Sequence, residues 1–197
     1  VVAGLMTKTN KVAYLTGLSF KGTNLQGRAY ELGAKSVNSS VEVVISYTGD
    51  FNDIAKGKEA ALALISTGVD VIYHLLDNAA PAVLQTAQEK GIYAVGNTTD
   101  QLDVAPKAVL TSTVQDVGGA IAYIANLAKN NQVKGEKYIL GIENIEITKL
   151  GRFNDILPEK IKQKVEETQQ KMLAGKLQFE DCSESSQAKV CIKEIPE

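Results

Sequence analysis

Residues 53–74, DIAKGKEAALALISTGVDVIYH, decide the fold. Apolar residues recur at helical spacing as far as Thr67, and Gly68 then separates this segment from a mostly apolar, β-branched run that begins at Val69. A glycine ends a helix at little cost because it can adopt positive φ, and a short apolar run bounded in this way is typical of a buried strand. The stretch therefore predicts a helix over residues 53–67 that leads directly into a strand over residues 69–74.

The same alternation of short apolar runs and longer segments of helical spacing extends over most of the chain. We expect further strands at residues 11–16, 41–47, 92–95, 109–111 and 137–142, and further helices at residues 25–37, 79–90, 116–130 and 158–174. Strands that alternate with helices form βαβ units, in which the strands run parallel. The sequence therefore predicts an α/β fold with a doubly wound, mainly parallel sheet.

The chain divides into one long structured part and a short polar end. We expect residues 1–177 to form a single α/β ligand-binding lobe and residues 178–197 to form a polar C-terminal extension, as a hairpin or an extended arm. Residues 1–6 resemble the end of a helix already under way, since no capping residue precedes them. We therefore expect that an upstream part of the protein, with any signal or lipid anchor, is missing from this chain.

The charge balance disfavours nucleic acid as a partner. Of the 197 residues, 21 are Lys or Arg and 23 are Asp or Glu, for a net charge of −2. Such a chain has no excess of positive charge with which to bind a phosphate backbone or an anionic membrane surface. No stretch approaches the roughly 20 consecutive apolar residues that span a bilayer.

The two cysteines, Cys182 and Cys191, lie close together near the C-terminus. Eight mostly polar residues separate them, so they could close a small hairpin disulfide, which would indicate an oxidising compartment. The alternative is two unrelated thiols. The chain has a single His and no Cys-x-x-Cys pair, so we expect no metal site and no cofactor.

Polar residues gather where the predicted strands end. In an open parallel sheet, ligands bind outside the carboxyl ends of the strands, where the loops into the following helices converge. The segments in that position carry hydroxyls, amides, carboxylates and a few aromatic rings, a mixture that suits a small polar ligand. Six candidate ligand-binding residues come from these segments: Phe20, His74, Asp77, Asn78, Thr98 and Asp100.

These candidates also have structural interpretations. Ser, Thr, Asn and Asp at strand ends often form turns or cap the next helix, and a His at the end of an apolar strand is often a satisfied core side chain. No nucleophile elbow, phosphate-binding loop or His-Glu-x-x-His motif is present in the sequence. We therefore expect a binding protein and no enzymatic activity.

Several blocks, taken together and in order, resemble the basic membrane protein family of nucleoside-binding lipoproteins. The most specific is Phe51-Asn52-Asp53 followed by Lys56-Gly57-Lys58-Glu59-Ala60, and the others lie at residues 5–14, 30–38, 89–96, 100–101, 109–112 and 140–144. The resemblance covers about residues 1–177. It implies one lobe of the type 1 periplasmic-binding-protein fold, in a two-lobed receptor outside the cytoplasmic membrane. Such receptors are usually lipid-anchored through the N-terminus and deliver nucleosides to the permease of an ABC importer.

The chain departs from the family pattern at the ligand positions. Two adjacent glycines of the family correspond here to Asp77 and Asn78, and its ribose-binding Asp corresponds to Thr98. Its Lys near the fifth strand corresponds to Gln115, and the aromatic residue that stacks on the base corresponds to Gln26. The resemblance thus adds Gln26 and Gln115 to the candidate ligand-binding residues and predicts weak or no binding of purine nucleosides.

Two functions follow as hypotheses. The first is a transport receptor whose specificity has drifted from nucleosides to another small polar ligand. The alternative is a regulatory or interaction protein that keeps the fold without small-molecule transport. In either case, the first lobe that supplies the other half of the family's cleft is absent from this chain.

Overall fold

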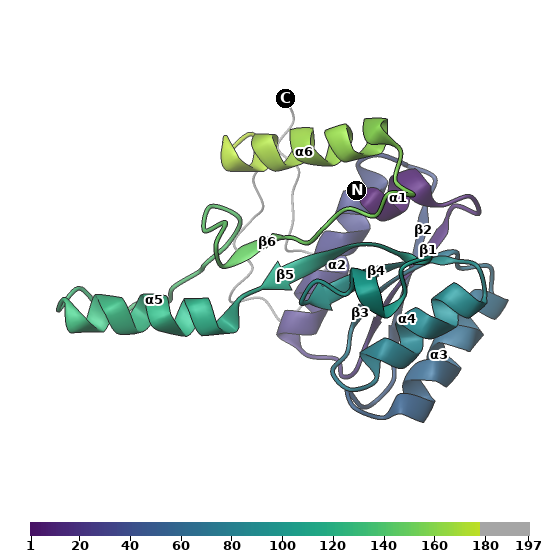
Figure 1. The fold of residues 1–197 in the computed structure, drawn as a ribbon, viewed down its shortest axis with the longest axis horizontal. Helices are drawn as coiled ribbons and strands as arrows, with labels where there is room; N and C mark the ends of the chain where they lie inside the picture. The colour runs from purple at the N-terminus through teal and green to yellow at the C-terminus, as the bar shows by residue number, and fades with distance from the viewer. Residues whose placement is uncertain (178–197) are drawn as a thin grey trace.

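A six-stranded sheet in the order β2-β1-β3-β4-β5-β6 forms the centre of the molecule (Figure 1). The computed structural model describes residues 1–177, so the predicted extension and the Cys182–Cys191 pair lie outside the described residues. The strands are β1 (Lys11–Thr16), β2 (Glu42–Tyr47), β3 (Val71–Leu75), β4 (Tyr93–Thr98), β5 (Val109–Gln115) and β6 (Thr148–Leu150). β1 to β5 run parallel and β6 is antiparallel to β5, which confirms the predicted mainly parallel sheet.

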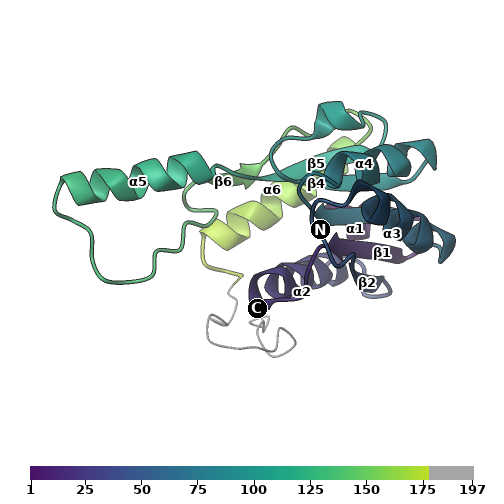
Figure 2. The ribbon, with the colours of Figure 1, turned by 90° about the horizontal axis from the view of Figure 1, so that it is seen from below.

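Helices cover both faces of the sheet, as the doubly wound prediction requires. The helices are α1 (Val2–Met6), α2 (Lys21–Lys35), α3 (Ile54–Ser66), α4 (Ala80–Glu89), α5 (Val117–Lys129) and α6 (Glu159–Leu173), with a 3₁₀ turn η1 at Leu102–Val104. Side chains of α1, α2 and α6 pack on one face of the strands, and those of α3 and α4 pack on the other (Figures 1 and 2).

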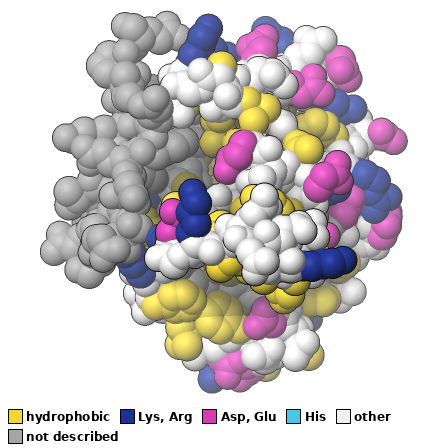
Figure 3. Space-filling view, turned by 90° about the vertical axis from the view of Figure 1, so that its left-hand side faces the viewer, with side chains coloured by type: hydrophobic (Ala, Val, Ile, Leu, Met, Phe, Trp, Pro, Cys, Tyr) yellow, Lys and Arg dark blue, Asp and Glu magenta, His cyan; other side chains and the backbone are white. Residues whose placement is uncertain are grey.

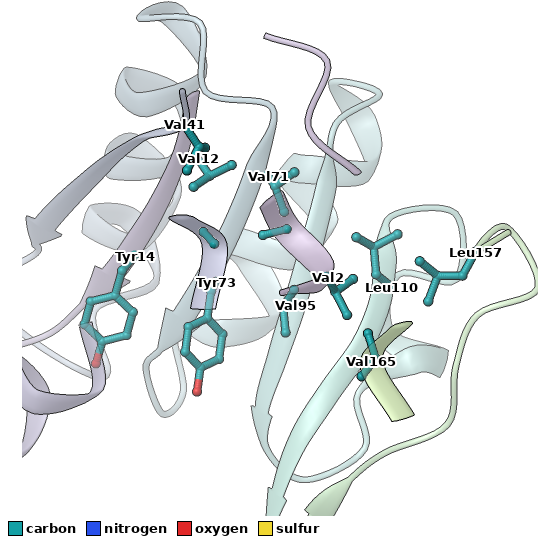
Figure 4. Close-up of a cluster of buried hydrophobic side chains, with 12 residues drawn as sticks. Val2, Val12, Tyr14, Val41, Val71, Tyr73, Val95, Leu110, Leu157 and Val165 are labelled. Carbon is teal, nitrogen blue, oxygen red and sulfur yellow. The ribbon is translucent and has the colours of Figure 1, made fainter. Parts of the chain in front are cut away.

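The two cores follow from the alternation of side chains along each strand. Tyr14 and Tyr73 point to the face covered by α1, α2 and α6, whereas Leu15 and Ile72 point to the face covered by α3 and α4. Successive strand residues face opposite sides, so a strand that is covered on both sides is apolar throughout. Figure 4 shows the first of these cores, with Leu110 of β5 and Val165 of α6 at its far end.

Local signals place most element boundaries where the sequence predicts them. The Asp53 side chain accepts a hydrogen bond from the backbone N–H of Lys56 at 3.0 Å and caps α3, and Gly68 after that helix has a φ of 94°. Asp116 caps α5 in the same way, through the N–H of Gly119 at 2.8 Å. The two largest boundary errors are four positions each: α2 begins at Lys21, before the predicted start at residue 25, and β5 extends to Gln115, beyond the predicted end at residue 111.

The strand predicted at residues 137–142 is wrong. Those residues are outside any strand, and the last strand of the sheet is β6, at Thr148–Leu150. The reason is that the chain leaves the sheet at the end of β5 and returns only at β6, so the apolar residues at 137–142 have no neighbouring strand with which to pair. Ile139, at the centre of the predicted strand, is 65% exposed.

Helix α5 projects away from the body of the molecule (Figures 1 and 2). It occupies the predicted helix at residues 116–130, but none of its residues is buried. Val117 and Ile121 are 60% and 65% exposed. Within residues 1–177, no helix combines the length and the apolar character needed to cross a bilayer.

Candidate functional site

The carboxyl ends of β1 to β5 meet along one edge of the sheet. β1 lies between β2 and β3. The chain passes from β1 to β2 on one side of β1 and then crosses to β3, which lies with the later strands on the other side. This change of strand order is the place where open α/β sheets bind ligands. We call this region the carboxyl edge; it includes residues 17–20, 47–50, 74–78 and 96–100, where β1, β2, β3 and β4 end.

Aromatic side chains occupy the part of the carboxyl edge beside β1 and β2. Phe20 is 52% exposed, and its ring stands edge-on to Phe51, with 6.3 Å between the ring centroids. Tyr47 at the end of β2 donates its hydroxyl hydrogen to Asn24 Oδ1 at 2.8 Å. Phe20 therefore presents an apolar ring to solvent at the place where the sequence predicts a ligand contact.

Asp77 and Asn78 lie in the loop after β3 and are both exposed. Their backbones are fixed: Asp77 N–H donates to the Phe51 carbonyl at 2.9 Å, and Asn78 N–H donates to Asn52 Oδ1 at 3.4 Å. Among the described residues, no side chain or backbone donor holds the Asp77 carboxylate. An ordered loop thus carries a free carboxylate at the carboxyl edge.

Thr98, the last residue of β4, has a φ of 69°. A β-branched residue is uncommon in this left-handed region because its side chain crowds the backbone. Its hydroxyl donates to Asn97 Oδ1 at 3.1 Å, and the residue is exposed. Strained backbone of this kind concentrates at functional sites, which supports the choice of Thr98 as a candidate.

Beneath Thr98, a polar cluster surrounds the hydroxyl of Tyr73. Gln26 Nε2 and Asn97 Nδ2 both donate to this oxygen, at 2.8 and 2.7 Å, and Thr113 Oγ1 lies 3.0 Å from it. Tyr14 donates its hydroxyl hydrogen to Gln26 Oε1 at 3.0 Å. We call Gln26, Tyr73, Asn97 and Thr113 the tyrosine hub; Figure 4 shows that the hydroxyls of Tyr14 and Tyr73 point toward the same end of the sheet.

The tyrosine hub explains one sequence candidate and adds others. Gln26 came from the family resemblance, and the structure places it here, whereas the sequence analysis did not select Tyr73 or Thr113. Tyr73 lies within the apolar strand predicted at residues 69–74, and Thr113 lies beyond the predicted end of its strand at residue 111. The available signal was that polar residues lie near the ends of these strands. The sequence does not give the strand register that brings their side chains together. Burial raises the pKa of Tyr73 to about 12, against the opposing effect of its hydrogen bonds, so its phenol stays neutral.

His74 is a structural side chain in this fold. It is fully buried, the N–H of Leu76 donates to its Nδ1 at 3.3 Å, and its Nε2 lies 2.8 Å from Gln101 Oε1. Because Nδ1 accepts a hydrogen bond, the proton of the neutral ring is on Nε2 and goes to Gln101. Burial lowers the pKa of His74 to about 4. Both ring nitrogens are thus engaged, which favours the structural interpretation over a ligand contact.

Asp100 is likewise held by the protein. Its Oδ2 accepts from the backbone N–H and from Nε of Arg152, at 3.0 and 2.8 Å, and its Oδ1 accepts from Leu102 N–H. Burial raises the pKa of Asp100, but the hydrogen bonds from Arg152 outweigh this effect and hold the pKa below its ordinary value. The carboxylate therefore ties the segment after β6 to the loop after β4.

Gln115 ends β5 at the root of α5, where it pairs with Thr148 of β6. Just beyond, Asp116 N–H donates to the Ile147 carbonyl at 2.7 Å, so the departing and returning chains run side by side. A groove of about 740 Å³ lies beside α5, lined by Asp116, Ala122, Tyr123, Asn126, Glu146 and Ile147 among others. Figure 3 shows hydrophobic side chains among polar ones on this side of the molecule.

At the carboxyl edge, Phe20 follows β1, Asp77 and Asn78 follow β3, and Thr98 and Gln115 end β4 and β5, while Gln26 reaches Tyr73 from α2; His74 and Asp100 serve the scaffold. A family model described as ABC transporter substrate-binding protein PnrA-like, Bmp, matches residues 1–181. The chain belongs to the Bmp family. This membership and the sheet topology confirm the resemblance predicted from the sequence.

Among the proteins with similar sequences, some are named as basic membrane proteins and one is named as a transcriptional activator. Basic membrane protein A of Borreliella afzelii is 32% identical over 141 residues, which are 70% of this chain and 43% of that protein. Transcriptional activator protein med of Bacillus subtilis is 28% identical over 84% of this chain and 51% of that protein. The chain thus spans about half the length of these relatives.

Solved structures show the same fold. An ABC transporter solute-binding protein from Aeropyrum pernix K1 superposes with a TM-score of 0.77 at 16% identity, over 98% of this chain and 67% of that one. The fold of this Bmp-family chain is therefore that of the periplasmic solute-binding proteins, as predicted. Across the described residues, no group of three or more His, Cys, Asp or Glu side chains is placed to hold a metal ion.

Proposed function

We propose that this chain is the ligand-binding lobe of an extracytoplasmic receptor that delivers a small polar molecule to an ABC permease. The observation that carries the proposal is the carboxyl edge of a Bmp-family chain, where exposed Phe20, Asp77 and Thr98 follow or end β1, β3 and β4 and the tyrosine hub lies next to Thr98. Hydroxyls, amides and one aromatic ring orient a ligand by hydrogen bonds and stacking. Such an arrangement supports binding without catalysis.

The carboxyl edge supplies one side of a cleft, and we propose that a first lobe supplies the other. The part of the chain that matches covers 43% and 51% of these two relatives, and α5 carries the apolar side chains of Val117 and Ile121 into solvent. A helix that is apolar and unburied needs a partner surface. The groove beside α5 gives the first lobe a place to dock, with the paired β5 and β6 as the connection between lobes.

The preferred ligand, on this proposal, is not a purine nucleoside. Asp77 and Asn78 place side chains where the family has glycines, and Thr98 lacks the carboxylate that grips ribose hydroxyls. Loss of a charged hydrogen bond typically forfeits about 1.5–3 kcal/mol. A different neutral polar compound therefore fits the replaced positions better.

The receptor is proposed to act outside the cytoplasmic membrane, held by a lipid anchor in sequence that precedes Val1. The redox state of Cys182 and Cys191 tests this location, because an oxidising compartment would join the two cysteines in a disulfide. We predict that mass spectrometry of the unreduced protein finds both cysteines in one disulfide, which contributes about 2–3 kcal/mol to stability. Two free thiols in protein prepared from an oxidising compartment would count against this location.

A second candidate function is regulation without transport. It is favoured by the relative named Transcriptional activator protein med and by the replaced ligand positions. A thermal-shift screen of the protein with its natural N-terminal sequence separates the two functions, with inosine, adenosine, guanosine, ribose, glucose, galactose and fructose as probes. A ligand at 100 times its Kd stabilises by about 2.7 kcal/mol, which raises the Tm measurably. A rise with at least one probe supports the receptor; no rise with any probe favours the regulator.

A further inference from the structure

The tyrosine hub has a fixed direction of hydrogen bonding. Two N–H groups, from Gln26 and Asn97, donate to the Tyr73 oxygen. The hydroxyl hydrogen of Tyr73 is then the group that faces its remaining partner, Thr113 Oγ1, at 3.0 Å. Tyr73 is 4% exposed and Asn97 is 3% exposed, so this arrangement is shielded from bulk water. Thr113 therefore accepts from Tyr73.

Several hydrogen-bond donors of the tyrosine hub have no acceptor among the described residues. The hydroxyl hydrogen of Thr113 has no acceptor within residues 1–177, and each of the Gln26 and Asn97 amides uses one of its two hydrogens. The amide oxygens are engaged already: Gln26 Oε1 accepts from Tyr14, and Asn97 Oδ1 accepts from Thr98. What the tyrosine hub still offers is N–H and O–H groups, so its natural complement is an acceptor oxygen.

The hub lies where a ligand would reach it. Thr113 pairs with Asn97 in the sheet, one position before the strained Thr98, and it is only partly buried. Three carboxylates, Asp50, Asp77 and Asp116, come soon after the ends of β2, β3 and β5, against the two cations Lys21 and Lys149. Arg152 is paired with Asp100 and Asp103. An anionic ligand would meet repulsion from these carboxylates, so the acceptor oxygen belongs to an uncharged group.

We propose that Thr113 is a specificity-determining residue that donates its hydroxyl hydrogen to a carbonyl or hydroxyl oxygen of an uncharged ligand. The inference rests on the proposed receptor function and adds the ligand's chemistry to it. Tyr73 is the positioning residue. It donates its hydroxyl hydrogen to Thr113 Oγ1, so the hydroxyl hydrogen of Thr113 points away from Tyr73.

The test compares Thr113→Val, which keeps the shape and removes the hydroxyl, with Thr113→Ser, which keeps the hydroxyl. The probe that raises the Tm of the parent most, among the seven compounds of the thermal-shift screen, is titrated into each protein by calorimetry. Thr168→Val is the matched control, because this threonine is partly buried on α6, as Thr113 is partly buried on β5, and bonds only within its own helix. Should Thr113→Val be too unstable to titrate, Thr113→Cys, with a weak donor, replaces it.

We expect Thr113→Val to weaken binding roughly 3- to 10-fold, as the loss of one neutral hydrogen bond requires. Thr113→Ser and Thr168→Val should stay within about twofold of the parent on the same scale. If the parent binds a probe and Thr113→Val binds it equally well, the inference is overturned and the receptor function stands. If the parent binds none of the seven compounds, the receptor function itself fails, and the inference fails with it.

Discussion

Thr98 combines a β-branched side chain with a left-handed backbone, at φ 69°, in the middle of the candidate site. Residues in this conformation cost on the order of 1–3 kcal/mol and persist where the surroundings fix them. Here the surroundings are the last pairing of β4 with β5 and the hydrogen bond from Thr98 to Asn97. The strain at Thr98 therefore lowers the free energy of unfolding, while it holds one exposed hydroxyl at the carboxyl edge.

Relief of this strain should stabilise the protein. Asn tolerates left-handed φ better than Thr does, so Thr98→Asn should raise the free energy of unfolding by about 0.5–1 kcal/mol. Urea denaturation measures the change, with Thr99→Asn as the control, because Thr99 is an exposed neighbour without positive φ. An unchanged or lowered free energy for Thr98→Asn would show that residue 98 is not strained.

His74 gives the protein a measurable pH dependence. Its pKa in the folded protein is about 4, against about 6.5 in the unfolded chain, so between these values only the unfolded chain binds the proton. Stability from neutral His74 is full above pH 6.5 and is lost as the pH falls toward 4. Because this is the single His of the chain, His74→Gln removes the effect completely.

The comparison is a urea denaturation series at pH 7, 6, 5 and 4.5. From pH 7 to 4.5 the parent should lose on the order of 2 kcal/mol more than His74→Gln, since one pKa unit corresponds to about 1.4 kcal/mol. Parallel stability curves for the two proteins would mean that the ring is not the buried, neutral group described above.

At the residue scale, the sequence predicts the neighbourhood of the site better than the role of each side chain. His74 lies near the end of β3 and Asp100 follows β4, as predicted, yet Gln101 and Arg152 bind their polar atoms. Arg152 is 52 residues from Asp100 in the chain, so no local pattern indicates that contact. Thr113 was missed for the same reason, because its partner Tyr73 is 40 residues away.

At the scale of elements, α5 is the feature that the single lobe does not explain. The helix is well capped by Asp116, but its apolar side chains meet no core of the described chain. Periodicity predicts such a helix correctly because spacing is local. The false strand at residues 137–142 arises nearby, because a short apolar run resembles a strand although no neighbouring strand within residues 1–177 pairs with it. The proposed first lobe would cover the apolar side chains of α5.

The α5 face provides a test that uses two forms of the protein. Ile121→Asp places a charge on the exposed face of α5, where the isolated 197-residue chain should lose no more than about 0.5 kcal/mol. In the protein with its natural N-terminal sequence, the same charge would be buried at the lobe contact and should cost more than about 2 kcal/mol.

Ala29→Asp, exposed on α2, is the control and should have little effect in either form. Free energies of unfolding from urea denaturation give the comparison. Equal effects of Ile121→Asp in both forms would contradict the docking of a first lobe on α5.

At the scale of the whole molecule, the layered architecture is the part that the sequence predicts most fully. The alternation of glycine-terminated helices and apolar runs fixes a parallel sheet with helices on both faces, and the structure has that arrangement. Ligand identity does not follow in the same way, because it depends on a few side chains at the carboxyl edge and on the surface that faces them. The family resemblance aligns Gln26, Asp77, Asn78, Thr98 and Gln115 with positions that the family uses for nucleosides, and we propose that these replacements change the ligand.

The most direct test of the receptor function is isothermal titration calorimetry of the protein with its natural N-terminal sequence. Each of inosine, adenosine, guanosine, ribose, glucose, galactose and fructose is titrated separately. The proposed function predicts saturable binding of at least one non-nucleoside compound at one site per protein, with purine nucleosides bound weakly or not at all. Micromolar or tighter binding of inosine, adenosine or guanosine would contradict the interpretation of the replaced positions, and the absence of binding heat with every compound would contradict the receptor function.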